Sequence, residues 1–465
     1  MAAIQANAVN ILYLTAAICF IFSLKGLSSP ESAHGGNGYG ISGMIFACIA
    51  AYLCTNCTPI DFAFQLTVLT IIIGGTIGIS IAQNISMTSL PQMIAGFHSL
   101  VGLAAVLIAF SVYYAPWLFE IVPPGSAAVP ASSFAEMSIG AAIGAITFSG
   151  SVVAFLKLHG IYKGHRIPLS LNAFLCSSIV CLIVYFVTTK SSTVFLLLTI
   201  LAFIFGAALI MPVGGADMPV VVSMLNSYSG WAASGIGFTL HNDLLIITGA
   251  LVGASGAILS YIMCKGMNRS LINVIFTPEP SVASPDAATE IKPFKQGSPE
   301  DAAFILKNAA SVIVVPGYGM ATSQAQHALR EMVDLLKKQG INVKYAIHPV
   351  AGRMPGHMNV LLAEANVPYE EVFELDEINR DFSCCDVAYV IGANDVTNPA
   401  AKKNPGSSIY GMPILDVEKA KVIMFLKRSM GTGYAGVDNE LFYSQNTMML
   451  LGDAKKTTEA VVKAI

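Results

Sequence analysis

Charged side chains are scarce in this chain, since only 11% of its 465 residues are Asp, Glu, Lys or Arg, whereas a soluble protein has about a quarter. Together with a hydrophobic share of 54%, this scarcity excludes a disordered chain and an ordinary cytosolic enzyme. The net charge of -3 gives no sign of a nucleic-acid partner. The nine cysteines form no disulfide pattern, and Cys54-x-x-Cys57 lacks the second ligand pair of a zinc site, so we expect no metal.

The few charges are unevenly distributed along the chain. Residues 1–275 contain only 13 of the 53 charged residues. That part also contains about nine apolar runs long enough to cross a bilayer as helices. These runs lie near residues 8–27, 41–57, 62–82, 93–114, 134–156, 169–188, 192–212, 217–239 and 243–264. The sequence therefore predicts a multi-span transmembrane helical bundle over 1–275, a linker rich in Pro, Ser and Ala over 276–300, and a soluble domain over 301–465.

Positive charges in the loops between these runs predict an orientation in the lipid membrane. With the N-terminus outside, six Lys or Arg residues face the cytoplasm and only Lys190 faces outward, as the positive-inside rule requires. An odd number of spans then places the soluble domain in the cytoplasm. Because Lys25 follows the first run and no Lys or Arg precedes it, we interpret that run as a spanning helix and not as a cleaved signal peptide.

Polar residues inside the apolar runs are few, which makes each of them informative. His98 lies within the fourth run, where it is either a proton carrier or a structural histidine with satisfied hydrogen bonds. Asn226 lies in a polar stretch over 223–229, where it either bonds a water chain or joins two helices. Small residues at helical spacing in the third, fifth and ninth runs predict close helix packing. They are Gly74, Gly75, Gly78, Gly140, Gly144, Gly249, Gly253 and Gly256.

Strand-like and helix-like segments alternate in the last part of the chain. Strands are predicted at 311–315, 344–347, 387–391 and 421–426, and helices at 321–339, at 356–365 and after Asp453. This alternation predicts a Rossmann-like, doubly wound parallel sheet. His327 and His357 fall on these helices without a partner at ligand spacing, so we expect both at the surface.

A glycine motif follows the first predicted strand. Residues 317–322 read Gly-Tyr-Gly-Met-Ala-Thr, which is the dinucleotide fingerprint with Thr322 in place of its third glycine. Gly317 permits the tight turn, and Gly319 lets the backbone approach a pyrophosphate. The glycine-rich loops over 352–356, 392–395 and 431–436 also follow strands, and are either ligand loops or simple turns.

Two features of the sequence indicate which dinucleotide is preferred: a missing acidic residue and a cluster of cationic residues. An NAD site places an acid after the second strand, but residues 348–355 contain none. Lys427, Arg428 and Ser429 end a later strand and suit a 2′-phosphate. The alternative is an ordinary solvated strand end. We favour NADP.

Several long strings resemble the beta subunit of the proton-translocating NAD(P) transhydrogenases. They lie at 211–219, 226–231, 315–321, 348–359, 391–395, 427–430 and 433–436, and the resemblance covers nearly the whole chain. It implies a membrane domain that conducts protons and a domain that binds NADP(H). It further implies a partner alpha subunit carrying NAD(H), an α2β2 assembly and a bacterial inner membrane. Hydride would pass directly between the two nicotinamides, without a catalytic side chain, and proton entry would drive NADPH formation.

The resemblance also implies roles for individual residues. His98, Asn226 and Asp217 match the family's proton pathway, and Asp217 would also help to couple the two domains. Asp395 would be a titrating link to the proton step, and the segment from Met430 to Tyr434 would form a lid. The implied NADP(H) residues are Gly317, Tyr318, Gly319, Met320, Ala321, Val350, Ala351, Gly352, Arg353, Met354, Pro355, Gly392, Ala393, Asn394, Asp395, Gly411, Met412, Lys427, Arg428, Ser429, Met430, Gly431, Thr432, Gly433, Tyr434, Asp453 and Ala454. Thr322 and the order Val396-Thr397 depart from the family pattern.

Two other classes of membrane protein are weighed against this interpretation. A channel or transporter with a nucleotide-sensing Rossmann domain needs its own conduction feature, and the potassium-filter string is absent. A transmembrane haem reductase needs paired intramembrane histidines as axial ligands, and His98 is the only histidine well inside a predicted span.

Overall fold

The computed structural model describes residues 2–27, 32–54, 62–119, 121, 129–162, 167–214, 217–276, 293–354, 356–407, 409–433 and 435–465. The chain forms two compact units. The first, here called the helical unit, comprises Met1–Phe155, Ser170–Ala208 and Leu225–Gly256. The second unit comprises Leu156–Leu169, Leu209–Met224 and Ala257–Ile465. Cys57, Lys163, Arg166, Pro355, Tyr434 and most of the predicted linker lie outside the described residues.

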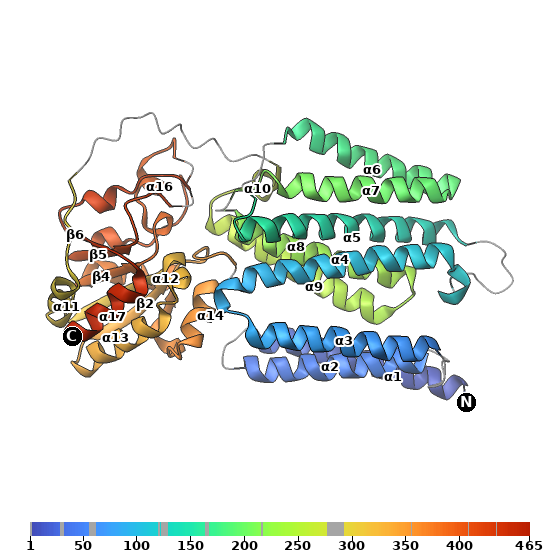
Figure 1. Cartoon of the computed structure of the whole chain (residues 1–465), viewed down its shortest axis with the longest axis horizontal. Helices are drawn as coiled ribbons and strands as arrows, with labels where there is room; N and C mark the ends of the chain where they lie inside the picture. Colours follow the sequence, from blue (N-terminus) through green and yellow to red (C-terminus); the bar gives the residue numbers. More distant parts are fainter. Residues whose placement is uncertain are drawn as a thin grey trace. The chain divides into compact units, whose positions relative to one another are not determined.

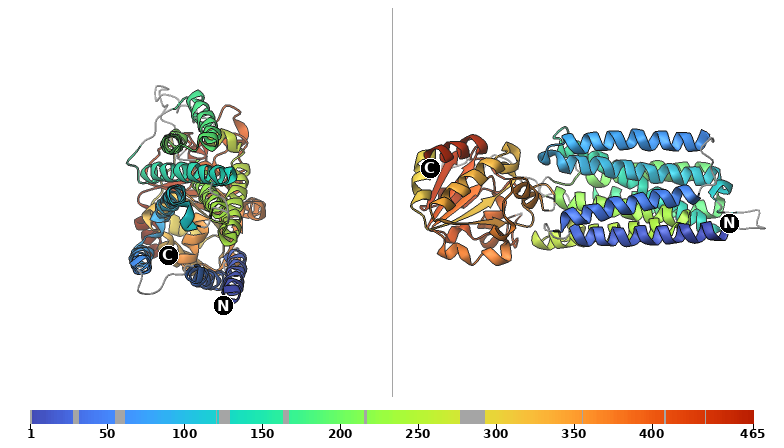
Figure 2. Two further views of the ribbon diagram at one scale, coloured as in Figure 1. Left: turned by 90° about the vertical axis from the view of Figure 1, so that its right-hand side faces the viewer. Right: turned by 90° about the horizontal axis from the view of Figure 1, so that it is seen from below.

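Nine long helices lie within the described part of residues 1–275. They are α1 (Ala2–Leu27), α2 (Ala33–Cys54), α3 (Phe62–Asn84), α4 (Leu90–Tyr114), α5 (Ala131–Leu158), α6 (Leu169–Thr189), α7 (Ser192–Ile210), α8 (Met218–Thr239) and α9 (Asp243–Gly266). In the helical unit they run side by side and roughly parallel (Figures 1 and 2). By length and hydropathy, seven described helices can cross a membrane, and α2 and α8 are not among them. The membrane bundle is therefore confirmed, while the number of spans stays a prediction.

Glycines bring some of these helices into close contact, as predicted, but not all of them. A Cβ at Gly144 of α5 would lie 2.8 Å from the carbonyl oxygen of Gly102 in α4. A Cβ at Gly249 of α9 would lie 2.6 Å from that of Gly230 in α8. By contrast, a Cβ at Gly74, Gly75 or Gly78 of α3 would meet no described atom within 4 Å. The prediction of close packing is wrong for α3 within this chain, because none of its residues over 64–84 is buried in the described structure.

A six-stranded parallel sheet forms the centre of the second unit. Its strands are β1 (Ser311–Pro316), β2 (Asn342–Ile347), β3 (Val372–Glu374), β4 (Val387–Ile391), β5 (Val422–Lys427) and β6 (Thr447–Leu451), in the order β3-β2-β1-β4-β5-β6. The strand order reverses between β1 and β4, and such a switch point is where doubly wound folds bind ligands. The predicted fold class is confirmed. The sequence reading missed β3, which is only three residues long, and β6.

Helices cover the sheet (Figure 1). They include α11 (Pro299–Lys307), α12 (Tyr318–Ser323), α13 (Gln326–Lys338), α14 (His357–Glu364) and α17 (Ala454–Ala464), and the same domain contains the short helices α15 (Leu375–Ile378) and α16 (Ala400–Lys403). The short helix α10 (Leu271–Phe276) follows α9 and packs instead against buried residues of α8 and α9. Buried Leu329, Met332, Val333 and Leu336 give α13 an apolar face at helical spacing. The single helix predicted over 321–339 is in fact two helices, since Gln324 takes a left-handed conformation with φ 53°. Ser298 caps α11, so helical structure begins at Pro299.

Candidate functional site: a pocket at the switch point and a membrane histidine

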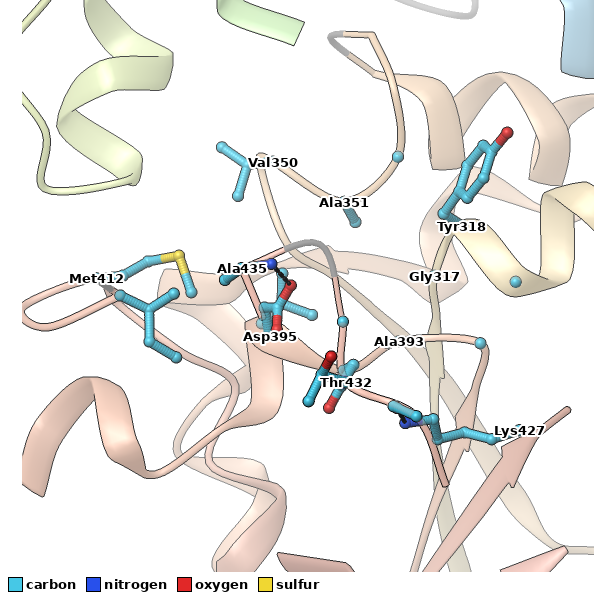
Figure 3. A pocket seen from close by; sticks show the side chains of 18 of the residues that line it. Gly317, Tyr318, Val350, Ala351, Ala393, Asp395, Met412, Lys427, Thr432 and Ala435 are labelled. Atoms are coloured by element: carbon cyan, nitrogen blue, oxygen red, sulfur yellow. Dashed lines mark hydrogen bonds between the residues drawn. The ribbon is translucent and has the colours of Figure 1, made fainter. Parts of the chain in front are cut away.

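A cavity of about 590 Å³ opens at the carboxyl ends of β1, β4 and β5 (Figure 3). Among the predicted cofactor residues, its wall includes Gly317, Tyr318, Gly319, Val350, Ala351, Gly352, Gly392, Ala393, Asn394, Asp395, Met412, Lys427, Arg428, Ser429, Gly431, Thr432 and Gly433. Loops far apart in the sequence therefore converge on one site. The described wall also includes Met267, Arg269, Val396, Ile409 and Ala435, which the predicted site omits. Of these, only Ala435 carried a sequence signal, because it lies within the glycine-rich run over 431–436.

Of the remaining predicted cofactor residues, Pro355 and Tyr434 lie outside the described residues, and the others do not line the cavity. Met320 and Ala321 are buried in α12, below the turn. Asp453 caps α17 by accepting hydrogen bonds from the backbone N–H groups of Lys455 and Lys456. The others are Arg353, Met354, Gly411, Met430 and Ala454.

The glycines of the fingerprint pack against the loop after β4. The backbone N–H of Gly319 donates to the carbonyl oxygen of Gly392 at 2.9 Å. A Cβ at Gly319 would lie 2.6 Å from the Cα of Gly392, which itself has φ +69°. A Cβ at Gly317 would lie 2.5 Å from the Cα of Ala393. The motif thus allows two loops to touch at the switch point.

The loop over 431–435 is held against Asp395. A carboxylate oxygen of Asp395 accepts a hydrogen bond from the backbone N–H of Ala435 at 3.1 Å (Figure 3). A Cβ at Gly433 would collide with the same carboxylate. Asp395 is also the one acidic residue in the described wall of the cavity. The implied lid and the implied titrating residue are therefore in direct contact.

The two cations at the end of β5 lie in different environments. The Nζ atom of Lys427 donates to the carbonyl oxygen of Gly431 at 2.7 Å and lies 4.1 Å from the centre of the Phe442 ring. Burial lowers the pKa of Lys427 to about 8. The side chain of Arg428 is 74% exposed, and its guanidinium is 3.8 Å from Asp453. A half-buried cation and an exposed one thus stand side by side at the pocket.

One buried histidine, His357, lies next to the loop that follows β2. His357 is fully buried, and its Nδ1 accepts a hydrogen bond from the backbone N–H of Arg353 at 3.1 Å. The guanidinium of Arg353 lies 4.3 Å from the centre of the Tyr318 ring. Burial lowers the pKa of His357 to about 4. The prediction of a surface position is wrong for His357, because α14 turns this residue inward, and it is confirmed for His327, which is exposed.

In the helical unit, His98 of α4 contacts α8. Its Nδ1 is 3.2 Å from the hydroxyl of Ser229, and that hydroxyl donates to the backbone carbonyl of Asn226 at 2.7 Å. The Nε2 atom of His98 is buried and has no hydrogen-bond partner in the described part of the chain. His98 and Asn226 are therefore brought together through Ser229, a residue noted in the sequence only as part of the polar stretch.

Asp217 lies at the start of α8 and is paired with Arg269. Both carboxylate oxygens face one guanidinium nitrogen, at 2.7 and 2.9 Å, and Asp217 is only 2% exposed. The ion pair joins the segments before α8 and after α9 within the second unit. Among the described residues there is no group of three or more His, Cys, Asp or Glu that could hold a metal ion.

Comparison with known proteins agrees with this arrangement. The family model described as "NAD(P) transhydrogenase beta subunit" matches residues 9–464. The chain belongs to this family. Two relatives from Rhodospirillum rubrum, both named "NAD(P) transhydrogenase subunit beta", are each 61% identical over 460 residues, which is 97% of this chain and 98% of the relative. The resemblance noted in the sequence is confirmed, and the chain is a subunit of an NAD(P) transhydrogenase, a membrane-bound oxidoreductase and translocase.

Proposed function

We propose that this chain binds NADP(H) in the pocket at the β1–β4 switch point and couples hydride exchange with NAD(H) to proton movement through the helical unit. The observation that carries the proposal is the pair Lys427 and Arg428, which stands at the wall of that pocket in a transhydrogenase beta subunit. Two adjacent cations suit the 2′-phosphate that distinguishes NADP(H) from NAD(H).

The wall of the pocket fits a reaction that needs no protein acid or base. Hydride passes between two nicotinamides when they are held in the right geometry, so the protein supplies position and exclusion of water. The loops around Gly317 and Gly392 form the base of the pocket, and Val350, Ala351 and Met412 add apolar wall. Asp395, in contact with the 431–435 loop, is placed to report the state of the site to that loop.

The hydrogen bonds of His98 indicate how it takes up a proton. The Ser229 hydroxyl has one hydrogen and donates it to the carbonyl of Asn226. The Nδ1 atom of His98 must then donate to Ser229, which leaves Nε2 as the acceptor in the neutral ring. A buried Nε2 with a free lone pair can accept a proton delivered along the bundle. By linkage, any effect of bound NADP(H) on this step has an equal counterpart in the reverse direction.

The proposal includes an assembly and a location. The partner is an alpha subunit that carries NAD(H), in an α2β2 complex of a bacterial inner membrane. The excess of Lys and Arg on one side supports an orientation with the N-terminus outside and the nucleotide domain in the cytoplasm. The roles of Asp217, Asp395 and the lid from Met430 to Tyr434 in coupling belong to the same proposal.

The nucleotide preference is tested by calorimetry on the full chain purified without the alpha subunit, so that NADH has no second site to bind. We expect NADPH to bind more tightly than NADH, and Lys427→Ala and Arg428→Ala each to weaken NADPH about tenfold to a hundredfold, the worth of a hydrogen bond to a charged group. NADH binding should not change. Lys456→Ala, at an exposed position of α17, is the matched control. Preference for NADH, or equal losses for both nucleotides, would contradict the proposal.

The proton pathway is tested in proteoliposomes. We expect His98→Ala to abolish proton-linked transhydrogenation while NADPH still binds, because the acceptor nitrogen is lost and the pocket is untouched. If pumping and linked turnover persisted at wild-type rates, His98 would not be the proton carrier.

A further inference from the structure

A hydrogen-bonded pair of asparagines connects the pocket with the segment after the lid. Asn394 follows β4 and lines the cavity. Asn439 is fully buried and begins a short 3-10 helix over Glu440–Tyr443. The side-chain nitrogen of Asn439 donates to the side-chain oxygen of Asn394 at 3.1 Å and to its backbone carbonyl at 3.3 Å. Neither residue is a general acid or base, so the pair is not explained by proton chemistry.

The orientation of the Asn439 amide is determined by its own neighbours. Its side-chain oxygen accepts a hydrogen bond from the backbone N–H of Leu441 at 3.1 Å. Because a backbone N–H can only donate, the atom facing it must be oxygen. The NH₂ group of Asn439 therefore faces Asn394.

The orientation of Asn439 in turn determines that of Asn394. The Asn394 atom that faces the Asn439 NH₂ group must be the carbonyl oxygen, so the Asn394 NH₂ group lies on the other side. This nitrogen is buried and has no hydrogen-bond partner in the described part of the chain. A buried donor without an acceptor is costly, and here it belongs to a residue in the wall of a ligand pocket. The missing acceptor is then most simply an atom of the ligand.

We propose that Asn439 is a positioning residue that fixes the Asn394 amide so that its NH₂ group donates to an oxygen of bound NADP(H). The acceptor oxygen belongs to the part of the nucleotide that crosses the β1–β4 switch point. Asn394 lies there because it follows Gly392 and Ala393, which touch the fingerprint turn. This inference rests on the proposed function; it adds one further residue, Asn439, to that site and gives the wall residue Asn394 a specific orientation.

The test is a double-mutant cycle on NADPH binding, in the full chain with its alpha subunit. Asn394→Ala removes the donor. In Asn439→Asp one carboxylate oxygen still accepts from Leu441, but the other faces the Asn394 oxygen, so the Asn394 amide turns over. We expect each single variant to weaken NADPH about tenfold. The double variant should be no weaker than Asn394→Ala alone, because the amide that Asn439 orients is then absent.

Other outcomes would overturn the inference. If Asn394→Ala left NADPH affinity unchanged, the donor would not reach the ligand. If the two losses multiplied to about a hundredfold in the double variant, Asn439 would only support the fold. Asn342→Asp, at an exposed position of β2, controls for the added charge. If Asn439→Asp fails to fold, Asn439→Ser replaces it, since serine can still cap the 3-10 helix but cannot donate in the same place.

The two proposals fail in different ways. If the unaltered chain does not prefer NADPH over NADH, the proposed function fails. If it does prefer NADPH and the cycle shows no coupling between Asn394 and Asn439, only the positioning role fails.

Discussion

Glycine allows close approach in both units of the chain, but the partners differ. In the sheet domain, Gly319 and Gly392 bring two loops together at the bottom of the pocket. In the helical unit, Gly102 and Gly144 bring α4 and α5 together. The glycines of α3 have the same spacing and meet nothing described within 4 Å. Glycine spacing thus indicates that an approach is possible, and only the surrounding fold decides whether it takes place.

Buried histidines show a second contrast between the two units. In the sheet domain, His348 has both ring nitrogens bonded, Nε2 to the carbonyl of Pro413 at 2.7 Å and Nδ1 to the backbone N–H of Val350 at 3.2 Å. In the helical unit, His98 has a bond on Nδ1 only. A histidine whose acceptor nitrogen already faces a backbone N–H is held in its neutral form, whereas one whose open nitrogen carries the lone pair can take up a proton. The difference separates a structural histidine from a candidate carrier, which the sequence could not do.

The largest effect is expected where two loop backbones touch. In Gly392→Ala the new Cβ would collide with Gly319, and the residue would have to keep φ +69°. We expect a loss of about 3 kcal/mol in the free energy of unfolding of the sheet domain, together with loss of NADPH binding. The measurement is denaturant unfolding, with hydrogen exchange of β1 and β4 as the local readout.

Gly340→Ala is the matched control for this prediction. Gly340 has φ +85° but no described atom within 4 Å of a Cβ, so only the left-handed conformation is penalised, by about 1 kcal/mol. Equal losses at the two positions would show that backbone strain, and not the contact between the loops, accounts for the loss of stability in Gly392→Ala.

A loss of stability of similar size, but without loss of the pocket's geometry, is expected from pH. Burial lowers the pKa of His348 to about 4, below the ordinary value near 6.5. Between about pH 4 and 6.5, His348 therefore binds a proton in the unfolded chain but not in the folded chain. The stability of the sheet domain is full above pH 6.5 and falls by about 3 kcal/mol for this residue as the pH drops to about 4. Unfolding curves between pH 7.5 and 4.5 should show the loss, and His348→Gln should reduce it.

His327→Gln, at an exposed position of α13, is the control for the pH experiment. Its pH dependence should match that of the unaltered chain. His357 is buried as well, with its pKa lowered to about 4, so part of the slope should survive in His348→Gln. A slope unaffected by His348→Gln would mean that this ring is not held neutral by the fold.

Local patterns predicted those features that depend on neighbours in the sequence. The apolar runs of β1 and β4, the turn at Gly317 and the cations at the end of β5 all have short-range signals. The break at Gln324 and the three-residue strand β3 have weak ones, because a left-handed residue or a short strand leaves little pattern. The inward turn of His357 is set by packing, which periodicity does not show.

Contacts between distant segments could not be predicted from pattern. The Asn394–Asn439 pair and the Ser229 bridge between His98 and α8 depend on how loops and helices meet in three dimensions. The family resemblance supplied most pocket residues, because strings of the chain were matched as wholes. It did not supply Asn439, which lies behind the wall and is reached only through its contact with Asn394.

The smallest effect is expected in the helical unit, where the two classes of glycine can be compared directly. Gly144→Ala places a Cβ 2.8 Å from the Gly102 carbonyl oxygen, so α4 and α5 must move apart, at about 1 kcal/mol. Gly74→Ala meets nothing described and should leave the thermal stability of the purified chain in detergent unchanged. If Gly74→Ala lowered stability only in the complex with the alpha subunit, a helix of that partner would lie against α3. If it lowered stability in this chain alone, the exposed position of α3 would be wrong, and the contrast between the two glycine classes would disappear.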